Sequence, residues 1–413
     1  MSHRKAIIAI ADGLGDRPIP QFGGLTPLQK AHTPNLDKVA AQGITGMMDL
    51  IGPGIPVGTD MGHLILFGGE ISEYMGRGPI EAAGIDMAIE SGDIIFRCNF
   101  ATIDDKGIVI DRRAGRINEL TDELANAVNK MDLGNNITVY FKPATEHRAV
   151  LILRGENLSE HITDSDPKLP QEGLSYQKIE AKVDCDKARR TRDALNIFLE
   201  KSHQILKQHP INLERQAKGL LPANFILTRG PGQYKAIASV TERYGIKACC
   251  IAGETTVLGV ANLLGIEPIT HPSFSANAGS NFALKAEMTL KAIKDHDVVF
   301  VHIKATDLAG HDNLPENKVV AIEAFDKLVG KILADLPEST YIALAADHST
   351  PCEVKEHTGE PVPIAVYGPS IRVDHVQQYN EIVCSQGGLN RLSGKNYLYT
   401  ILDYIEFSQK QGS

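Results

Sequence analysis

The stretch that decides the fold reads YIALAADHSTPCEVKEH and covers residues 341–357. Its first six residues are apolar and are followed by turn-forming residues, which predicts a buried parallel strand. That strand delivers Asp347 and His348 together at its carboxyl end, where open α/β sheets bind their ligands. With His357 on the following loop, these side chains suit a divalent metal. Taken alone, they also fit a histidine bonded to a nearby carbonyl and an aspartate capping the next turn.

The composition indicates a soluble globular protein. The chain has 413 residues, of which 43% are hydrophobic, enough for one large or two ordinary cores. Its 42 basic and 51 acidic residues give a net charge of −9, which favours neither nucleic acid nor an anionic membrane as a partner. No apolar run approaches the roughly 20 residues of a membrane span. The first residues lead straight into a strand and not into a signal peptide, so a cytoplasmic location is expected.

The six cysteines show no CxxC pattern and no metal-ligand spacing. They are therefore expected to be reduced structural thiols. Cys352 lies inside the deciding stretch, but it follows a proline and has no base at a fixed spacing. Packing is the favoured role for it, ahead of nucleophilic catalysis.

A second short apolar run, residues 6–11, ends at Asp12. It predicts a central strand that stops at a carboxylate, with Gly13 and Gly15 allowing a sharp turn beside it. An Asp-Gly pair after a strand is an ordinary turn in most proteins. Asp12 therefore needs partners before it can be taken as a ligand.

The loop of residues 52–60 is rich in glycine and proline and leads into a helical pattern. The Thr59 hydroxyl and several free backbone N–H groups then lie at a helix N-terminus, which can hold a phosphoryl group. The alternative is that Thr59 is an ordinary N-cap. No GxxxxGK[ST] motif occurs, which argues against a Walker-type ATPase.

Short apolar strands alternate with helices in the C-terminal half of the chain. The predicted strands include residues 225–227, 248–251 and 298–303. This alternation is typical of an α/β fold with a doubly wound, mostly parallel sheet.

A smaller domain is predicted to interrupt this fold. Glycines between residues 76 and 92 are spaced like a hinge, and the sequence beyond them changes in character. We therefore expect residues 1–92 and 222–413 to form the α/β domain, with residues 93–221 inserted as a smaller α+β domain.

The insert carries clustered arginines. Arg112, Arg113 and Arg116 fall within five residues, and Arg148 precedes a strand-like run. Guanidinium groups bind phosphate and carboxylate with paired hydrogen bonds. The same cluster could also form a solvated charged face, although substrate binding is slightly favoured.

The predicted strand at 298–303 is followed by Lys304 and then by Asp307 and His311. Asp307 and His311 are four residues apart, so on a helical turn they share one face and can share a metal. Together with Asp12, the Asp347–His348 pair and His357, several strand ends now offer ligands. A metal site explains this better than a coincidence of turn residues.

These motifs, in this order, resemble the alkaline-phosphatase superfamily, and within it the archaeal-type cofactor-independent phosphoglycerate mutases. The resemblance covers essentially the whole chain. It is carried by residues 12–18, 33–37, 76–79, 99–102, 111–116, 307–311 and 347–351.

The resemblance implies an alkaline-phosphatase-like core and two divalent metal ions. Mn²⁺ is the favoured metal, with Co²⁺, Mg²⁺ and Zn²⁺ as alternatives. Positions that hold one ion in that family correspond to Asp12, Thr59, Asp347 and His348. Positions that hold the second correspond to Asp307, His311 and His357.

The implied reaction interconverts 3-phosphoglycerate and 2-phosphoglycerate, a step of glycolysis and gluconeogenesis, through a phosphoenzyme at Thr59. Lys304 would neutralise phosphoryl oxygens, while the insert would act as a substrate-binding lid that excludes water and holds the carboxylate with its arginines. The family nucleophile is usually serine, and this chain has threonine. This departure, with a second at residues 68–71, keeps open a divergent homoserine-kinase-like phosphotransferase. A metal-dependent phosphatase or sulfatase and a non-catalytic relative also stay open.

Overall fold

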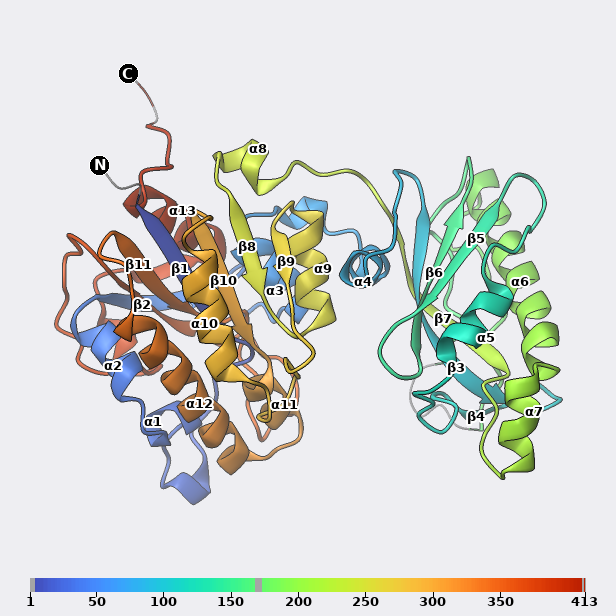
Figure 1. Ribbon diagram of the computed structural model, residues 1–413, viewed down its shortest axis with the longest axis horizontal. Helices are drawn as coiled ribbons and strands as arrows, with labels where there is room; N and C mark the ends of the chain where they lie inside the picture. The colour runs from blue at the N-terminus through green and yellow to red at the C-terminus, as the bar shows by residue number, and fades with distance from the viewer. Residues whose placement is uncertain (1–3, 168–172, 411, 413) are drawn as a thin grey trace. The chain divides into compact units, whose positions relative to one another are not determined.

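A computed structural model describes residues 4–167, 173–410 and 412 of the chain. The chain divides into two compact units (Figure 1). Unit 1 comprises Met1–Tyr74 and Ile237–Ser413, and unit 2 comprises Met75–Ala236. Two domains are predicted from the sequence, but the boundaries expected after residues 92 and 221 differ from these.

Unit 1 is built on an eight-stranded sheet with the order β13-β2-β12-β11-β1-β10-β8-β9. All neighbouring strands are parallel except that β12 runs antiparallel to β11 and β2. The predicted doubly wound, mostly parallel sheet is confirmed. Its strands are β1 (Lys5–Ala11), β2 (Ile44–Asp49), β8 (Ala248–Ile251), β9 (Glu267–Ile269), β10 (Val298–Ile303), β11 (Thr340–Ala345), β12 (Val362–Tyr367) and β13 (Asn390–Ser393).

Helices cover both faces of this sheet (Figure 1), which is why the apolar runs of β1, β10 and β11 are buried throughout. One packed group consists of α1 (Pro27–Lys30), α2 (Pro34–Ala41), α10 (Phe282–Ala292) and α12 (Pro315–Ala334). The other consists of α3 (Thr59–Leu66), α9 (Thr255–Leu263) and α13 (Gly394–Tyr404). Shorter elements are α8 (Val240–Tyr244), α11 (Ala305–His311), η1 (Pro20–Phe22), η2 (Ile71–Glu73) and η3 (Cys384–Gln386). Within the described ranges, no helix combines the length and apolarity needed to cross a membrane.

The three central strands end at the same edge of the sheet. Ile10 of β1 pairs with His302 of β10 and with Ala345 of β11. Because all three strands are parallel, the residues that follow them emerge side by side. Asp12, Lys304 and Asp347 therefore come together, as the sequence predicts.

Unit 2 contains an antiparallel sheet in which β3 pairs with β4, β6 and β7, and β5 pairs with β6. Helices α5, α6 and α7 belong to this unit, and α4 packs on β3 and β7. The strands are β3 (Ile94–Ile103), β4 (Val109–Asp111), β5 (Thr138–Pro143), β6 (Arg148–Arg154) and β7 (Phe225–Gln233). The helices are α4 (Arg77–Gly84), α5 (Thr121–Val128), α6 (Asp186–Lys207) and α7 (Pro210–Ala217).

The assignment of residues 225–227 to the doubly wound sheet is wrong. They form part of β7, which pairs with β3, and Phe225 joins the hydrophobic core of unit 2. On the opposite face of the sheet, Ala82 of α4 packs with Ile95 and Val150. These contacts place residues 75–92 and 222–236 in unit 2 and so shift both boundaries.

All six cysteines are free thiols, and five of them are buried. Burial raises the pKa of the Cys352 thiol to about 12, so at neutral pH it stays protonated. The predicted packing role for Cys352 fits this environment.

A buried ion pair joins two of the loops at the carboxyl edge of the sheet. Lys318 of α12 donates to Asp16 Oδ2 at 2.8 Å and to the carbonyls of Gly15 and Thr350 at 3.1 and 2.9 Å. Both charged side chains are buried. The ammonium thus holds the loop after β1 against the loop after β11.

We expect Lys318→Met to lower the free energy of unfolding by about 3–5 kcal/mol, because it leaves the Asp16 carboxylate buried without its counter-charge. Denaturant unfolding followed by circular dichroism measures the change. Lys331→Met on the same helix is the matched control, since its pair with Glu287 is largely exposed and is expected to contribute less than about 1 kcal/mol. Equal effects of the two substitutions would contradict this role for Lys318.

Candidate active site

The carboxyl edge of the unit 1 sheet holds a compact cluster of charged side chains. Lys304 Nζ lies 2.9 Å from Asp12 Oδ1 and 2.7 Å from Asp307 Oδ2. His348 Nε2 lies 3.4 Å from Asp12 Oδ1 and 3.1 Å from Asp347 Oδ2. The structure therefore brings together residues that the sequence places far apart.

The turn after Asp12 requires glycine. Gly13 has a φ of +61°, and a Cβ at this position would lie 2.5 Å from Thr350 Oγ1 and 2.8 Å from the Asp307 side chain. Its backbone N–H also donates to Asp347 Oδ1 at 3.1 Å. The predicted turn thus lets the three segments that carry Asp12, Asp307 and Asp347 approach one another closely.

Thr59 is the first residue of α3, and the N-cap is Gly58. Its hydroxyl accepts a hydrogen bond from Lys304 Nζ at 2.9 Å and lies 3.3 Å from His348 Nε2. The alternative that Thr59 is the N-cap is therefore wrong. The hydroxyl faces the charged cluster at the positive end of the helix dipole.

His311 and His357 present free Nε2 atoms to Asp307. The Nδ1 atoms of His311 and His357 lie 2.8 Å from the carbonyls of Lys355 and Val57. Since a carbonyl can only accept, Nδ1 carries the proton in both rings and Nε2 keeps its lone pair. The two Nε2 atoms lie 3.4 and 3.3 Å from Asp307 Oδ1 and 3.1 Å from each other. A cation between them would offset the repulsion between these two lone pairs and the carboxylate.

His348 is oriented by Thr350. The Thr350 hydroxyl donates to Asp307 Oδ1 at 2.7 Å and so accepts from His348 Nδ1 at 3.0 Å. This again leaves Nε2 unprotonated, and Nε2 faces Thr59 and Asp12. Such outer partners fix the tautomer of metal-ligating histidines.

The donor atoms fit divalent metal ions. Two groups of potential ligand atoms, each lying within 4.8 Å of one another, are Asp307 with His348 and His357, and Asp12 with Asp347 and His348. The resemblance instead pairs Asp307 with His311 and His357, and the geometry allows this as well. Imidazole and carboxylate without thiolate suit Mn²⁺, Co²⁺ or Zn²⁺.

The pKa shifts of Lys304, Asp307 and Asp347 all favour the charged forms of these side chains. Burial opposes the charged form of Lys304, but the carboxylates of Asp12 and Asp307 raise its pKa above the usual value. Burial likewise opposes ionisation of Asp307, yet its contacts with His357 and the Lys304 ammonium hold its pKa below the usual range. Burial also opposes ionisation of Asp347, whose contacts with His348 and His63 hold its pKa below the usual range. The Lys304 ammonium is paired with both Asp12 and Asp307, and Asp347 adds a third carboxyl group to the cluster, so acidic groups outnumber the ammonium.

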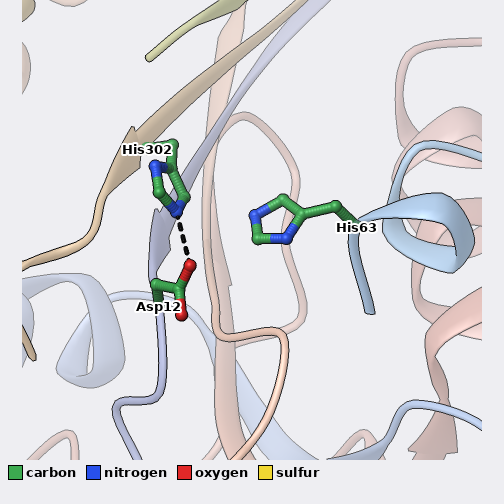
Figure 2. A group of neighbouring side chains, drawn as sticks. All are labelled: Asp12, His63 and His302. Atoms are coloured by element: carbon green, nitrogen blue, oxygen red, sulfur yellow. Dashed lines mark hydrogen bonds and ion pairs between the residues drawn. The ribbon is translucent and has the colours of Figure 1, made fainter. Parts of the chain in front are cut away.

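Two histidines of this region are absent from the sequence prediction. His302 and His63 lie beside Asp12, and the three residues form a further group of close potential ligands (Figure 2). Burial lowers the pKa of His302 to about 4. Two signals could have revealed them: an imidazole inside the apolar strand 298–303, and a histidine four residues after Thr59.

Unit 2 holds a separate cluster of arginines. Arg97 of β3 and Arg229 of β7 are directly paired across the sheet. Arg97 Nε lies 3.2 Å from Glu81 Oε1, and Arg112 forms an ion pair with Asp166. Burial and the charges of nearby arginines lower the pKa of Arg97 to about 10, although the Glu81 carboxylate opposes this shift. The cluster therefore concentrates positive charge in a poorly hydrated place.

The predicted arginines take part unequally. The charge of Arg112 lowers the pKa of Arg229. The charge of Arg148 lowers the pKa of Arg97. Arg113 is exposed, and its charge helps to lower the pKa of His147. Arg116 is also exposed, and within the described parts of unit 2 no contact ties it to the cluster.

Arg77 also belongs to this cluster, because its charge lowers the pKa of both Arg97 and Arg229. Arg77, Arg97 and Arg229 are not among the candidate site residues predicted from the sequence. Arg97 lies in the middle of the apolar strand of residues 94–103. A buried charge is costly unless it has partners, so an arginine at such a position itself indicates that charged groups lie nearby.

Comparison with known proteins places the chain in a family. Residues 40–212 match the family described as 2,3-bisphosphoglycerate-independent phosphoglycerate mutase. The enzyme of that name from Methanobrevibacter smithii is 41% identical over 414 residues, covering 99% of this chain and 100% of the relative. Its namesake from Pyrococcus abyssi is 42% identical, covering 99% and 100%. The chain belongs to the family of 2,3-bisphosphoglycerate-independent phosphoglycerate mutases.

Solved structures agree with this placement. A protein from Pyrococcus horikoshii is 35% identical with a TM-score of 0.86, and the match covers 100% of both chains. The cofactor-independent phosphoglycerate mutase from Thermoplasma acidophilum is 34% identical with a TM-score of 0.74, covering 97% of this chain and 100% of its own. Phosphoglycerate mutases are isomerases, so the chain is an enzyme of that class. The comparisons support the predicted mutase and not the phosphatase or homoserine-kinase-like alternatives.

Proposed function

We propose that the chain interconverts 3-phosphoglycerate and 2-phosphoglycerate without 2,3-bisphosphoglycerate, by carrying the phosphoryl group on Thr59. The observation that carries this proposal is the position of the Thr59 hydroxyl. It lies 2.9 Å from the Lys304 ammonium, at the N-terminus of α3 and beside the Asp and His cluster. A hydroxyl at this position can attack a phosphoryl group whose charge the surroundings neutralise.

The cluster would hold two divalent ions, with Mn²⁺ favoured. Asp12, Thr59, Asp347 and His348 would hold one ion, and Asp307, His311 and His357 the other. When bound, the ions would lower the pKa of the attacking hydroxyl and offset phosphoryl charge.

The reaction then proceeds by two transfers. Thr59 Oγ1 loses its proton and forms a bond to phosphorus, while the bond from phosphorus to O3 of the substrate breaks and the glycerate 3-hydroxyl gains a proton. The bound glycerate reorients, and its 2-hydroxyl takes the phosphoryl group from Thr59 as Oγ1 regains a proton. The Lys304 ammonium stabilises the phosphoryl oxygens in both transfers.

We also propose that unit 2 is the substrate-binding domain expected from the sequence. The sequence offers Arg112, Arg113, Arg116 and Arg148 as candidates, and we add Arg97 and Arg229, which are directly paired on β3 and β7. The Arg229 Nε atom is buried and has no hydrogen-bond partner among the residues the structure describes. The nearest carboxylate oxygen, Asp166 Oδ2, lies 3.9 Å from Arg229 Nη1, which leaves its guanidinium able to receive an anionic group of the substrate.

We expect Arg229→Lys to lower kcat/KM by roughly 10–100-fold, because lysine keeps the charge but loses the paired hydrogen bonds. Steady-state kinetics in both directions measures the change. Arg154→Lys is the matched control, since Arg154 belongs to the same sheet but is already paired with Asp93 and Glu90. Unchanged kinetics for Arg229→Lys would remove Arg229 from the substrate site.

Phosphorus NMR tests the proposed reaction. The enzyme is incubated with 3-phosphoglycerate and Mn²⁺ in the absence of 2,3-bisphosphoglycerate, and 2-phosphoglycerate should accumulate to equilibrium. Release of inorganic phosphate as the main product would indicate a phosphatase and contradict the proposal. Both phosphoglycerates are intermediates of glycolysis and gluconeogenesis, and we place the activity in the cytoplasm.

A further inference from the structure

We infer that His302 and His63 are positioning residues, each of which fixes the position of neighbouring groups in the phosphotransfer site. His302 fixes the Asp12 carboxylate, and His63 ties Thr59 to Asp347. This inference rests on the proposed function, because it assumes that Asp12, Thr59 and Asp347 act as described above.

His302 forms a hydrogen bond with one carboxylate oxygen of Asp12, and the other oxygen faces the site. The His302 Nε2–H donates to Asp12 Oδ2 at 2.9 Å, and both side chains are buried. Asp12 Oδ1 faces Lys304 Nζ at 2.9 Å and His348 Nε2 at 3.4 Å. His302 itself lies within β10, where its carbonyl accepts from the buried Lys285 Nζ at 2.7 Å. The carboxylate is thus held in one orientation with a single oxygen turned toward the site.

His63 connects the nucleophile to a ligand. Its Nδ1–H donates to the carbonyl of Thr59 at 2.8 Å, and the same nitrogen lies 3.3 Å from Asp347 Oδ2. The preceding residue, Gly62, lies so close to Asp347 that a Cβ on it would be 2.8 Å from the Asp347 carbonyl oxygen. The first turn of α3 is therefore pressed against Asp347, and His63 sets the position of Thr59 relative to it.

The two imidazoles also support each other. Their ring centroids lie 4.9 Å apart at an angle of 75°, with one edge toward the other face (Figure 2). His63 Nε2 and His302 Nδ1 have no hydrogen-bond partner in the described part of the chain. Each ring therefore uses one nitrogen only, and that nitrogen contacts a group of the proposed site.

A separate ion held by Asp12, His63 and His302 is the competing explanation, since their ligand atoms lie within 4.8 Å of one another. The 2.9 Å contact between His302 and Asp12 is an ordinary hydrogen-bond distance and already satisfies both atoms. Positioning accounts for this geometry without a further ion. Loss of an outer partner of this kind typically weakens metal binding by 10–100-fold.

The test compares two nearly isosteric variants of His302. His302→Gln keeps an N–H donor at the same reach, and His302→Met removes it. Mn²⁺ affinity and stoichiometry are measured by electron paramagnetic resonance on the full chain. We expect His302→Met to bind Mn²⁺ roughly 10–100-fold more weakly with unchanged stoichiometry, and His302→Gln to recover most of the affinity.

The control is His296→Met, which removes an imidazole paired with Glu267 at the opposite end of β10 and should leave Mn²⁺ binding unchanged. A parallel pair tests His63, since His63→Asn keeps a donor near the Nδ1 position and His63→Leu does not. We expect His63→Leu to lower kcat with little change in KM, and His63→Asn to restore much of it.

Equal Mn²⁺ affinity in His302→Met and the wild type would overturn the role of His302. Loss of one whole ion from His302→Met, with the remaining affinity unchanged, would do so as well and would establish a separate ion there. Failure of the proposed function would appear in the wild type itself, as absence of Mn²⁺ binding or of phosphoglycerate interconversion. The two failures are therefore distinguishable.

Discussion

Thr59→Val is expected to lower mutase activity on the order of 10⁶-fold, a loss comparable to deletion of a covalent nucleophile. Valine keeps the branched shape of threonine and removes only the oxygen that lies 2.9 Å from Lys304 Nζ. Because Thr59 is not the N-cap, α3 should form as before. A coupled assay of 2-phosphoglycerate formation measures the loss, and circular dichroism checks the fold.

Thr59→Ser is the matched control. It keeps the hydroxyl and removes one methyl group, so we expect activity within about tenfold of the wild type. Serine is also the usual nucleophile in the family that the sequence resembles, and the smaller side chain relieves crowding during in-line attack. A folded Thr59→Val protein that still interconverts the phosphoglycerates would refute a covalent role for Thr59.

Removal of metal is expected to have the second largest effect. After exhaustive chelation, activity should fall by several orders of magnitude, and Mn²⁺ or Co²⁺ should restore it. The physical reason is the cluster itself, where unprotonated Nε2 atoms of His311 and His357 lie 3.1 Å apart beside the Asp307 carboxylate. Without a cation these groups repel one another and cannot neutralise a phosphoryl group.

A ligand variant separates metal binding from folding. His357→Ala should lose Mn²⁺ affinity while keeping the circular dichroism spectrum of the wild type, since His357 lies on a loop outside the apolar core. Full activity after chelation, with metal content verified by elemental analysis, would rule out a metal-dependent mechanism.

The edge of the sheet that holds the candidate active site is predictable from the sequence. Short all-apolar runs are typical of buried parallel strands, and β1, β10 and β11 have this pattern. Polar residues directly after such strands must meet at one edge, so the sequence alone is enough to group Asp12, Asp307 and Asp347. The local signal is sufficient because strand direction alone determines the grouping.

The domain boundaries and the arginine cluster are less accessible to sequence analysis. A short apolar run such as residues 225–227 fits a parallel strand and an antiparallel strand equally well, and its pairing with β3 depends on contacts far along the chain. Arg97 and Arg229 become neighbours only through that pairing. The clustered Arg112, Arg113 and Arg116 stand out because they are close in sequence, yet only some of them approach the cluster.

His63 and His302 are hidden for a similar reason. The apolar pattern predicts the helix around His63 and the strand around His302 without using either histidine. The pattern therefore indicates no function for the imidazole. Their contacts with Thr59, Asp347 and Asp12 arise from the packing of α3 against the end of the sheet.

Mass spectrometry of the intact and digested protein tests the central claim most directly. The wild type is incubated with 3-phosphoglycerate and Mn²⁺, without 2,3-bisphosphoglycerate, and quenched during turnover. The account predicts a mass increase of one phosphoryl group located on Thr59. Turnover without a phosphorylated enzyme, or with the phosphoryl group on a residue other than Thr59, would contradict it.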